Sequence, residues 1–434
     1  MAGALSDIRV VDATGPIGHY AGRLLADLGA DVIKVEPLAG DEARGYGPFL
    51  PDLDPREASV QFLLLNANKR GAAIDLGRGE GREAFQQLVQ SADVLLESWS
   101  PRERAALGFE DAAFGADRPD LVRASVTGWG LTGPYADWAY ADIAGEAMSG
   151  VMNLSGFVDG APTQLADLQG FHCASINATA GILAALFHRD ASGEGQRVEV
   201  SMHESLLMAE ETAMQSADIN ELDRERSGGS RVASALGYLL PGLGVYESSD
   251  GHIYSMCTGT AGSGFSGLVA LINEIDDAGP LNDDPFDSLI REQMDTGLIR
   301  EVMTDPVRAA ETTPVLEEMD EHIAAFFRRH PAKVLYELGQ ERRVLIGAVN
   351  SPAAISESPQ LADRGWFTTI EDIGRGRTLR YPGPPWDLQG TPAELRRPAP
   401  LLGEHTFEVL REAGLSDDAL AALDAGSAIL GVAR

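Results

Sequence analysis

The sequence predicts an α/β protein whose largest part is a parallel, doubly wound sheet. Short apolar runs of strand length alternate with amphipathic helical runs between residues 8 and 127. Turns containing glycine follow several of these strands, as they do in βαβ units. The chain has 434 residues, enough for two or three domains at roughly 100–200 residues each.

The first βαβ unit occupies the N-terminal residues. Ile8–Asp12 is a strand, Gly15–Gly18 is a turn, and Tyr20–Leu28 is a helix with Tyr20, Leu24, Leu25 and Leu28 on one face. Gly29 ends that helix, and Asp31–Glu36 forms the second strand. Because a parallel pair needs such a helical crossover, this order predicts a parallel sheet.

The same alternation continues along the chain. We expect strands at Ala72–Leu76, Val94–Glu97 and Leu121–Thr127, with a helix at Gly81–Ser91. Beyond them the further expected elements are a long apolar helix at Gly170–Arg189, a strand and helix at Val198–Glu211, paired strands at Gly242–Met256, an acidic loop at Asn273–Asp287, helices at Asp320–Arg329 and Pro331–Leu338, strands and loops from Val349, and a helical Glu404–Leu423.

The polar, glycine-containing segment 220–231 has no apolar face to bury, so we expect a linker there. The expected organisation is a large domain beginning with residues 1–219, this linker, a smaller α+β domain at 232–345, and a return to the large domain at 346–434.

Charge and composition exclude several classes of function. Lys and Arg total 34 against 66 Asp and Glu, a net charge of −32 that repels nucleic acids and anionic membranes. The two cysteines, Cys173 and Cys257, are too few for a disulfide framework or a four-ligand zinc site. Met1–Asp7 does not resemble an export signal, and apolar runs such as Gly181–Phe187 are too short to span a bilayer. We expect a cytoplasmic protein with no metal, nucleic-acid or membrane partner.

The glycines after the first strand can be compared with the fingerprint of a dinucleotide-binding site. Gly15, Gly18 and Gly22 are spaced G-x-x-G-x-x-x-G, and Pro16 lies among them. A dinucleotide fingerprint needs G-x-G-x-x-G so that the backbone can approach a pyrophosphate. The spacing favours an ordinary strand-to-helix turn.

Several blocks of sequence, in order along most of the chain, resemble the class III CoA-transferase family, which includes formyl-CoA transferase, carnitine CoA-transferase and α-methylacyl-CoA racemase. These blocks are Val10–Asp12, Leu24–Pro37, Asn68–Arg70, Ile74–Leu76, Ala92–Glu97, Gly128–Gly130, Gly133–Tyr135, Met148–Gly150, Gly181–Arg189, Gly193–Val198 and Ala348–Arg364. The resemblance implies a Rossmann-like large domain made from both ends of the chain, an inserted smaller domain and an interlocked homodimer. It also implies transfer of CoA from an acyl-CoA to a carboxylic acid, with CoA thioesters as substrates and no prosthetic group.

Asp167, just before the long apolar helix, is the candidate nucleophile. From the residues alone it is an N-cap, because aspartate accepts backbone N–H groups at the positive end of a helix. The same donors favour the ionised carboxylate that attacks a thioester. The resemblance implies that Asp167 forms the covalent intermediate.

Two alternatives remain open at this point. Racemases of the family carry Gly-His-Asp where this chain has Tyr140-Ala141-Asp142, and Ala141 cannot move a proton. Transferase is therefore favoured over racemase or epimerase, with His172 as the residue to examine. The chain could instead be a non-catalytic CoA-binding subunit, although Asp167 argues against that role.

The resemblance also implies residues that contact CoA, which are Ile17, Gly18, Asp75, Leu76, Arg78, Ser98, Trp99, Arg104, Tyr140 and Ala141. Trp99 either flanks the adenine or packs in the core. Because CoA is polyanionic, we expect the basic residues Lys69, Arg70, Arg78, Arg102 and Arg104 to gather at its entrance. The glycine-rich segment 259–267 is either a lid over the site or an ordinary loop.

Overall fold

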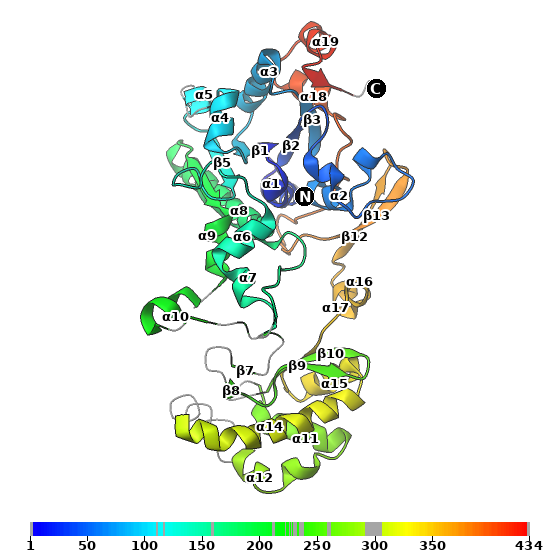
Figure 1. Cartoon of the computed structure of the whole chain (residues 1–434). Coiled ribbons are helices and arrows are strands. Elements are labelled where there is room, and N and C mark those ends of the chain that lie inside the picture. Colours follow the sequence, from blue (N-terminus) through cyan, green and yellow to red (C-terminus); the bar gives the residue numbers. More distant parts are fainter. Residues whose placement is uncertain are drawn as a thin grey trace. The chain divides into compact units, whose positions relative to one another are not determined.

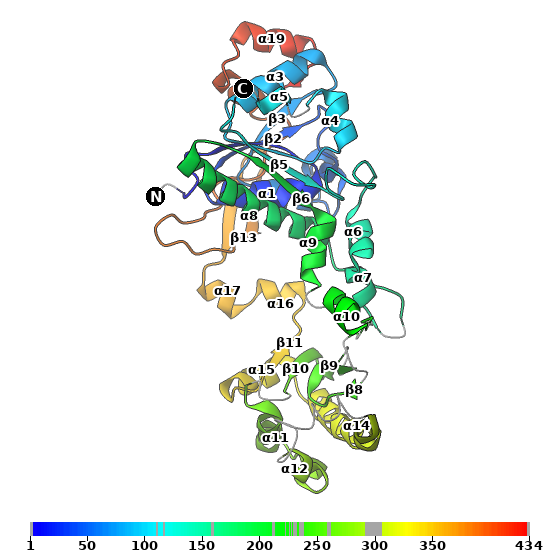
Figure 2. The same cartoon turned by 90° about the vertical axis from the view of Figure 1, so that its left-hand side faces the viewer.

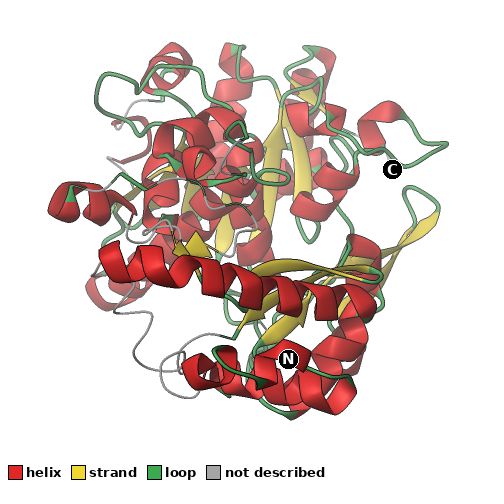
Figure 3. Ribbon diagram, turned by 60° about the horizontal axis from the view of Figure 1, so that its bottom comes forward, coloured by secondary structure: helices red, strands yellow, loops and turns green. Residues whose placement is uncertain are grey.

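The computed structural model describes residues 3–109, 112–115, 118–157, 160–210, 213–221, 223–224, 226, 228, 232–233, 238–257, 262–290 and 306–431. The chain divides into two compact units (Figure 1). Both units contain helices and strands (Figure 3). The first unit comprises residues 1–149, 165–209 and 359–434, and the second comprises residues 150–164 and 210–358. The domain bounds expected from the sequence stay a prediction, and part of the expected linker at 220–231 lies outside the described residues.

A seven-stranded sheet forms the centre of the first unit. Its strands are β1 (Arg9–Ala13), β2 (Asp31–Glu36), β3 (Arg70–Ile74), β4 (Val94–Glu97), β5 (Val122–Thr127), β6 (Arg197–Ser201) and β14 (Ile429–Leu430). They lie in the order β14-β3-β2-β1-β4-β5-β6. All neighbours are parallel except β14, which pairs antiparallel with β3. The predicted parallel α/β fold is confirmed, with a doubly wound strand order.

Helices cover both faces of this sheet (Figure 2). On one face lie α1 (Pro16–Asp27) and α8 (Gln169–Ser192). On the other face, α3 (Gly79–Gln90), α5 (Ala112–Gly115), α18 (Thr406–Glu412) and α19 (Asp417–Ala425) bury apolar side chains in a common core. The last two helices bring the C-terminal residues beside β3, which is why β14 can join that edge.

The remaining elements of the first unit are shorter. They are α2 (Val60–Asn66), α4 (Pro101–Leu107), α6 (Asp142–Ser149), α9 (Met202–Ala209), α17 (Pro359–Asp363), the 3-10 turns η1 (Glu42–Gly45) and η2 (Pro55–Glu57), and the hairpin of β12 (Phe367–Asp372) with β13 (Arg377–Pro382).

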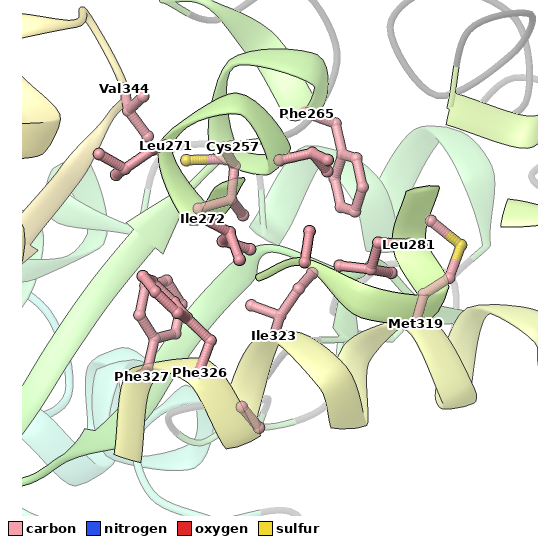
Figure 4. Close-up of a cluster of buried hydrophobic side chains, with 14 of the residues drawn as sticks. Cys257, Phe265, Leu271, Ile272, Leu281, Met319, Ile323, Phe326, Phe327 and Val344 are labelled. Carbon is pink, nitrogen blue, oxygen red and sulfur yellow. The ribbon is translucent and has the colours of Figure 1, made fainter. Parts of the chain in front are cut away.

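The second unit combines an antiparallel sheet with helices. Its sheet has the order β11-β10-β9, from β9 (Leu243–Ser248), β10 (Gly251–Met256) and β11 (Ile346–Ala348). Its other elements are α7 (Val151–Leu154), α10 (Ala213–Asn220), β7 (Val232–Ala233), β8 (Tyr238–Leu239), α11 (Gly264–Ile275), η3 (Gly279–Asn282), α12 (Phe286–Leu289), α14 (Pro306–Arg329), α15 (Ala332–Glu341) and α16 (Pro352–Ser356). In Figure 4, Met319, Ile323, Phe326 and Phe327 of α14 face side chains of α11, including Phe265.

Several expected elements need correction. The helix expected at Asp320–Arg329 is the C-terminal part of α14, which begins at Pro306, and the strand expected at Ala72–Leu76 is β3 at Arg70–Ile74. The first helix begins at Pro16 rather than Tyr20, because proline at the first helical position is favourable and Pro16–Leu25 is buried apart from Tyr20. The expected acidic loop at 273–287 contains η3 and the start of α12, since Leu281 and Phe286 enter the second unit's core. The expected helical segment 404–423 is two helices, interrupted at Gly414, whose φ of +99° a helix excludes.

Among the described residues, α8 is the one helix long and apolar enough to cross a membrane by length and composition. Half of its apolar window is buried, and it packs on α1, β5 and β6. We therefore interpret α8 as an internal helix of the first unit.

Candidate active site

The strand order places a topological switch point at the carboxyl ends of β1 and β4. The chain leaves β1 through α1 toward β2, whereas β4 lies on the opposite side of β1. Ligands of doubly wound sheets bind at such a switch point. Here the two strand ends are joined directly, because the Gly15 N–H donates to Ser98 Oγ at 2.8 Å.

Tyr140 extends this joint toward α6 and α8. Its hydroxyl hydrogen-bonds to the side chain of Ser98, and burial raises the pKa of Tyr140. Its ring meets Phe171 of α8 edge-on at 6.2 Å between centroids. Ala141 follows and is exposed. The structure therefore brings Ser98, Tyr140 and the β1–α1 turn together at the switch point.

Two other predicted contacts, Ile17 and Gly18, are buried in the first turn of α1. The carbonyl of Ile17 accepts a hydrogen bond from Ser175 Oγ of α8 at 2.7 Å. A Cβ on Gly18 would lie 2.4 Å from Thr14 Cγ2, so only glycine fits there. The Ile17 carbonyl and the small size of Gly18 allow α1 to pack closely against its neighbours, and the contact of these two residues with CoA stays a prediction.

Asp75, Leu76 and Arg78 lie at the carboxyl end of β3, on the same edge of the sheet. Asp75 Oδ1 accepts from the Gly77 N–H at 2.9 Å. The Arg78 guanidinium lies 3.5 Å from Asp75 Oδ2 and is about half exposed. A phosphate approaching this edge can therefore reach Arg78.

The segment after β4 contributes more to packing than to an open surface. The ring of Trp99 packs on Phe85 and Phe109, with centroids 5.9 and 5.3 Å away. Arg104 donates to Glu97 and to Ser125 Oγ and is mostly buried. Its neighbour Arg102 is exposed.

The prediction that Lys69 and Arg70 lie at the CoA entrance is wrong. Lys69 is fully buried and donates to Asp12 Oδ2 at 2.8 Å, to Asn66 Oδ1 at 2.8 Å and to the His19 carbonyl at 2.9 Å. Burial lowers the pKa of Lys69 to about 8. Arg70 is held by three carboxylates, those of Asp31, Glu408 and Glu412. Each of these cations neutralises acidic groups of the fold and is already engaged.

A second buried lysine joins Lys69 in anchoring the β1–α1 turn. Lys34 donates to the carbonyl of Thr14 and lies 2.9 Å from Asp41 Oδ2. His19 Nε2 lies 3.1 Å from the same carboxylate. Asp12 accepts from both the N–H and the hydroxyl of Thr14. The turn at the switch point is thus held in place by the buried charges of Lys34 and Asp12, which both bond to Thr14.

Asp167 is exposed and lies just before α8, in the left-handed region with φ of +58°. The prediction that it caps α8 is wrong: the residue at the N-cap position is Leu168, without a side-chain cap. A positive φ turns the Asp167 residue out of the cap geometry, which is extended. Asp142 of α6 takes over, since its Oδ1 accepts from the Phe171 N–H at 2.8 Å.

His172 connects Asp167 with α1. Its ring meets Tyr20 edge-on at 5.2 Å between centroids. Burial lowers the pKa of His172, and the nearby charge of Asp167 only partly opposes this. The imidazole is therefore neutral near pH 7. Asp167 therefore lies near a histidine that packs on α1, the helix that starts at the switch point.

Sequence reasoning missed the two buried carboxyls of α6, Asp142 and Glu146. Glu146 Oε2 accepts from the Leu165 N–H at 2.9 Å, so both residues bind the backbone around Asp167. The available signal was their spacing, because acidic residues four apart lie on one face of a helix.

A model of CoA-transferase family III matches residues 5–406.

The chain belongs to CoA-transferase family III.

Relatives with known names agree with this assignment. The chain is 33% identical to succinyl-CoA:(R)-benzylsuccinate CoA-transferase subunit BbsE of Thauera aromatica, covering 94% of each chain. It is 30% identical to succinyl-CoA:mesaconate CoA-transferase of Haloarcula hispanica, over 95% of this chain and 97% of that protein. It is also 30% identical to formyl-CoA:oxalate CoA-transferase of Streptomyces avermitilis, over 99% and 100% of the two. The protein is a CoA-transferase, and its substrates are CoA thioesters and acids.

Solved structures share the fold. A CAIB/BAIF family protein from Brucella suis superposes with a TM-score of 0.76 at 24% identity, over 95% of this chain and 100% of that one. Rv3272 from M. tuberculosis gives a TM-score of 0.71 at 23% identity, over 94% and 99%.

Two further expectations concern the glycine-rich segment and metal binding. Of the glycine-rich segment 259–267, residues 259–261 lie outside the described residues, and 264–267 form the first turn of α11. Within the described part of the chain no three His, Cys, Asp or Glu side chains are grouped as a metal site would require.

Proposed function

We propose that this family III CoA-transferase carries CoA on Asp167 as a covalent aspartyl thioester. The observation that supports this role is an exposed carboxylate, held at a positive φ and close to the helix that starts at the switch point. Strained backbone of this kind is concentrated at functional sites. Neutral His172 beside it leaves the carboxylate free of a cationic partner on that side.

The proposed reaction moves CoA from the donor acid to the acceptor acid without hydrolysis of a thioester. Asp167 Oδ attacks the donor thioester carbonyl and the C–S bond breaks. CoA thiolate is released, and a mixed anhydride of Asp167 with the donor acid is formed. The thiolate then attacks the Asp167 Cγ, which releases the donor acid and leaves the aspartyl thioester. The acceptor carboxylate attacks the same carbon and expels the thiolate, which gives a second mixed anhydride. The thiolate then attacks the acceptor carbonyl of this anhydride, which forms the new acyl-CoA and releases the Asp167 carboxylate. Each intermediate stays activated, so the energy of the donor thioester is kept.

We propose that CoA lies along the carboxyl edge of the sheet. Arg78 and Arg102 are exposed there or beside it and suit the phosphates of CoA. The other expected contacts keep their place as proposals, namely Ile17, Gly18, Asp75, Leu76, Ser98, Trp99, Arg104, Tyr140 and Ala141.

For the acceptor we propose a dicarboxylic acid. The relatives named above act on benzylsuccinate, mesaconate or oxalate, according to their names, and these acids share two carboxylates. One carboxylate would become the thioester, while the other would need a cationic or hydrogen-bond-donating group of the protein.

We propose that the enzyme is a homodimer that acts in the cytoplasm. Large apolar side chains of the first unit are exposed on α8 and α9, including Phe187 and Met208, each at 81%. Faces of this kind are usually covered by a protein partner. Light scattering after gel filtration tests the dimer, and a monomer, or activity that requires a second kind of chain, would contradict it.

The decisive experiment follows CoA on the protein. Incubating the enzyme with succinyl-CoA and a panel of dicarboxylic acids should give exchange, and mass spectrometry of the denatured protein should find CoA on Asp167. Asp167→Ala should abolish both. Full exchange by that variant would refute the proposal. Deuterium uptake from solvent at the α-carbon without CoA exchange would instead identify a racemase.

A further inference from the structure

Two buried carboxyls of α6 bracket the segment that carries Asp167. Asp142 and Glu146 are four residues apart on one face of the helix, with 3% and 0% exposure. Glu146 Oε2 accepts from the Leu165 N–H at 2.9 Å, two residues before Asp167. Asp142 Oδ1 accepts from the Phe171 N–H at 2.8 Å, four residues after it. The backbone is therefore anchored on both sides of the candidate nucleophile.

Between the anchors the hydrogen bonds are local, since Gln169 Nε2 donates to the Ala166 carbonyl and the His172 N–H donates to the Leu168 carbonyl. Asp167 is exposed there and takes a conformation that costs a non-glycine residue of order 1–3 kcal/mol. Such a conformation persists only when the surrounding structure fixes it. The two hydrogen bonds to α6 supply that constraint, because they set where the chain enters and leaves the turn.

The two carboxyls also need each other. Each uses one oxygen on the backbone, and the remaining atoms, Asp142 Oδ2 and Glu146 Oε1, are buried. The side chains are within hydrogen-bonding reach of one another. Two negative charges buried close together repel, which favours the protonated form of Asp142. Burial, followed by the interaction with Glu146, raises the pKa of Asp142 to about 6.

Packing from α9 and α8 closes the pair off from water. Met202 and Leu206 of α9 are 0% and 1% exposed. A Cβ on Gly170 would lie 3.1 Å from Asp142 Oδ1 and 3.1 Å from Leu206 Cδ1. Glycine at position 170 therefore allows the carboxyl to approach the start of α8 closely.

We propose that Asp142 and Glu146 are positioning residues, a pair of buried carboxyls that hold the backbone on both sides of Asp167. This inference rests on the proposed role of Asp167 as the nucleophile. A displacement of a reacting group by about 1 Å can cost on the order of 100-fold in rate, so the pair acts on the chemical step and hardly on CoA binding.

The test compares leucine and glutamine at position 146. Glu146→Leu removes the acceptor for the Leu165 N–H, whereas Glu146→Gln keeps an acceptor and can donate its amide to Asp142. We expect Glu146→Leu to lower kcat about 10- to 100-fold with KM for the acyl-CoA changed less than about threefold. We expect Glu146→Gln to stay within about threefold of wild type in both. Exposed Glu83 on α3 provides the matched controls, Glu83→Leu and Glu83→Gln, which should leave both constants unchanged.

A second variant covers the case in which Glu146→Leu does not fold. Gly170→Ala favours the helix but forces Asp142 to move by a few tenths of an ångström. We expect it to fold and to lose kcat with little change in KM. Wild-type kcat in folded Glu146→Leu, or in Gly170→Ala if that leucine variant does not fold, would overturn the inference.

The rate at which CoA appears on Asp167 separates this inference from the proposed function. If the wild-type enzyme forms no adduct on Asp167, the proposed function fails and the inference fails with it. If the wild type forms the adduct and Glu146→Leu forms it equally fast, only the inference fails. Slow formation in Glu146→Leu and recovery in Glu146→Gln would support both.

Discussion

Replacement of Lys69 by methionine tests whether this lysine stabilises the core of the first unit, where the structure places it, and not the CoA entrance where the sequence predicted it. Lys69→Met keeps most of the side-chain volume but removes a buried ammonium whose three donors reach Asp12, Asn66 and the His19 carbonyl. Asp12, itself 0% exposed, keeps its hydrogen bonds from Thr14 and the nearby charge of Lys34. Breaking one side of a buried ion pair costs about 3–5 kcal/mol. The expected loss in the free energy of unfolding of the first unit is therefore about 3–5 kcal/mol.

The chain provides a selective probe for this measurement. All five tryptophans, Trp99, Trp129, Trp138, Trp366 and Trp386, belong to the first unit. Urea unfolding followed by tryptophan fluorescence therefore reports that unit alone. Lys333→Met is the matched control, because the Lys333 side chain is 73% exposed in the second unit, and its change should stay within about 0.5 kcal/mol.

A double variant and a kinetic measurement complete the test. Asp12→Asn with Lys69→Met should recover part of the loss, since a neutral amide no longer leaves a buried charge unpaired. Folded Lys69→Met should keep its KM for the acyl-CoA, whereas Arg78→Ala should raise it. A loss of less than about 1 kcal/mol together with a tenfold higher KM would refute the reasoning, because it would place Lys69 on the ligand.

Three further predictions use other parts of the structure. Phe265→Ala empties a fully buried position in the second unit's core (Figure 4) and should cost about 3–5 kcal/mol, visible by far-UV circular dichroism but not by tryptophan fluorescence. Ser100→Ala removes the capping box of α4 and should lower the free energy of unfolding of the first unit by about 1 kcal/mol; an unchanged urea midpoint would contradict the cap. Because burial and then Glu146 raise the pKa of Asp142 from 3.8 to about 6, the folded state holds a proton that the unfolded chain releases, so this group lowers stability as pH rises from about 4 to 6. Asp142→Asn should therefore lose less stability than wild type over that range, by about 1–2 kcal/mol, in fluorescence-detected urea titrations, and parallel pH curves would contradict the assignment.

The sequence by itself determined the fold class and the family. Strand-length apolar runs alternate with helical ones, and local periodicity of this kind is visible without knowing the contacts. Asp31–Glu36 and Val94–Glu97 have the predicted bounds because turn residues or charges flank each run. Family membership was carried by blocks spread along the chain, and the family model confirms it over residues 5–406. The position of Asp167 just before α8 was also predictable, although its nucleophilic role stays a proposal.

Only the tertiary structure decided which charged groups are free and which are engaged. Lys69 and Arg78 look alike in the sequence, yet one is sealed against Asp12 and the other is half exposed. Likewise, the cap of α8 comes from Asp142, 29 residues before Phe171, and not from neighbouring Asp167. Burial and hydrogen bonding depend on residues that meet from distant parts of the chain, and they change the energy of a charge far more than its neighbours in sequence do. The strand order that brings Gly15 to Ser98, 83 residues apart, is the clearest such case, because it creates the switch point itself.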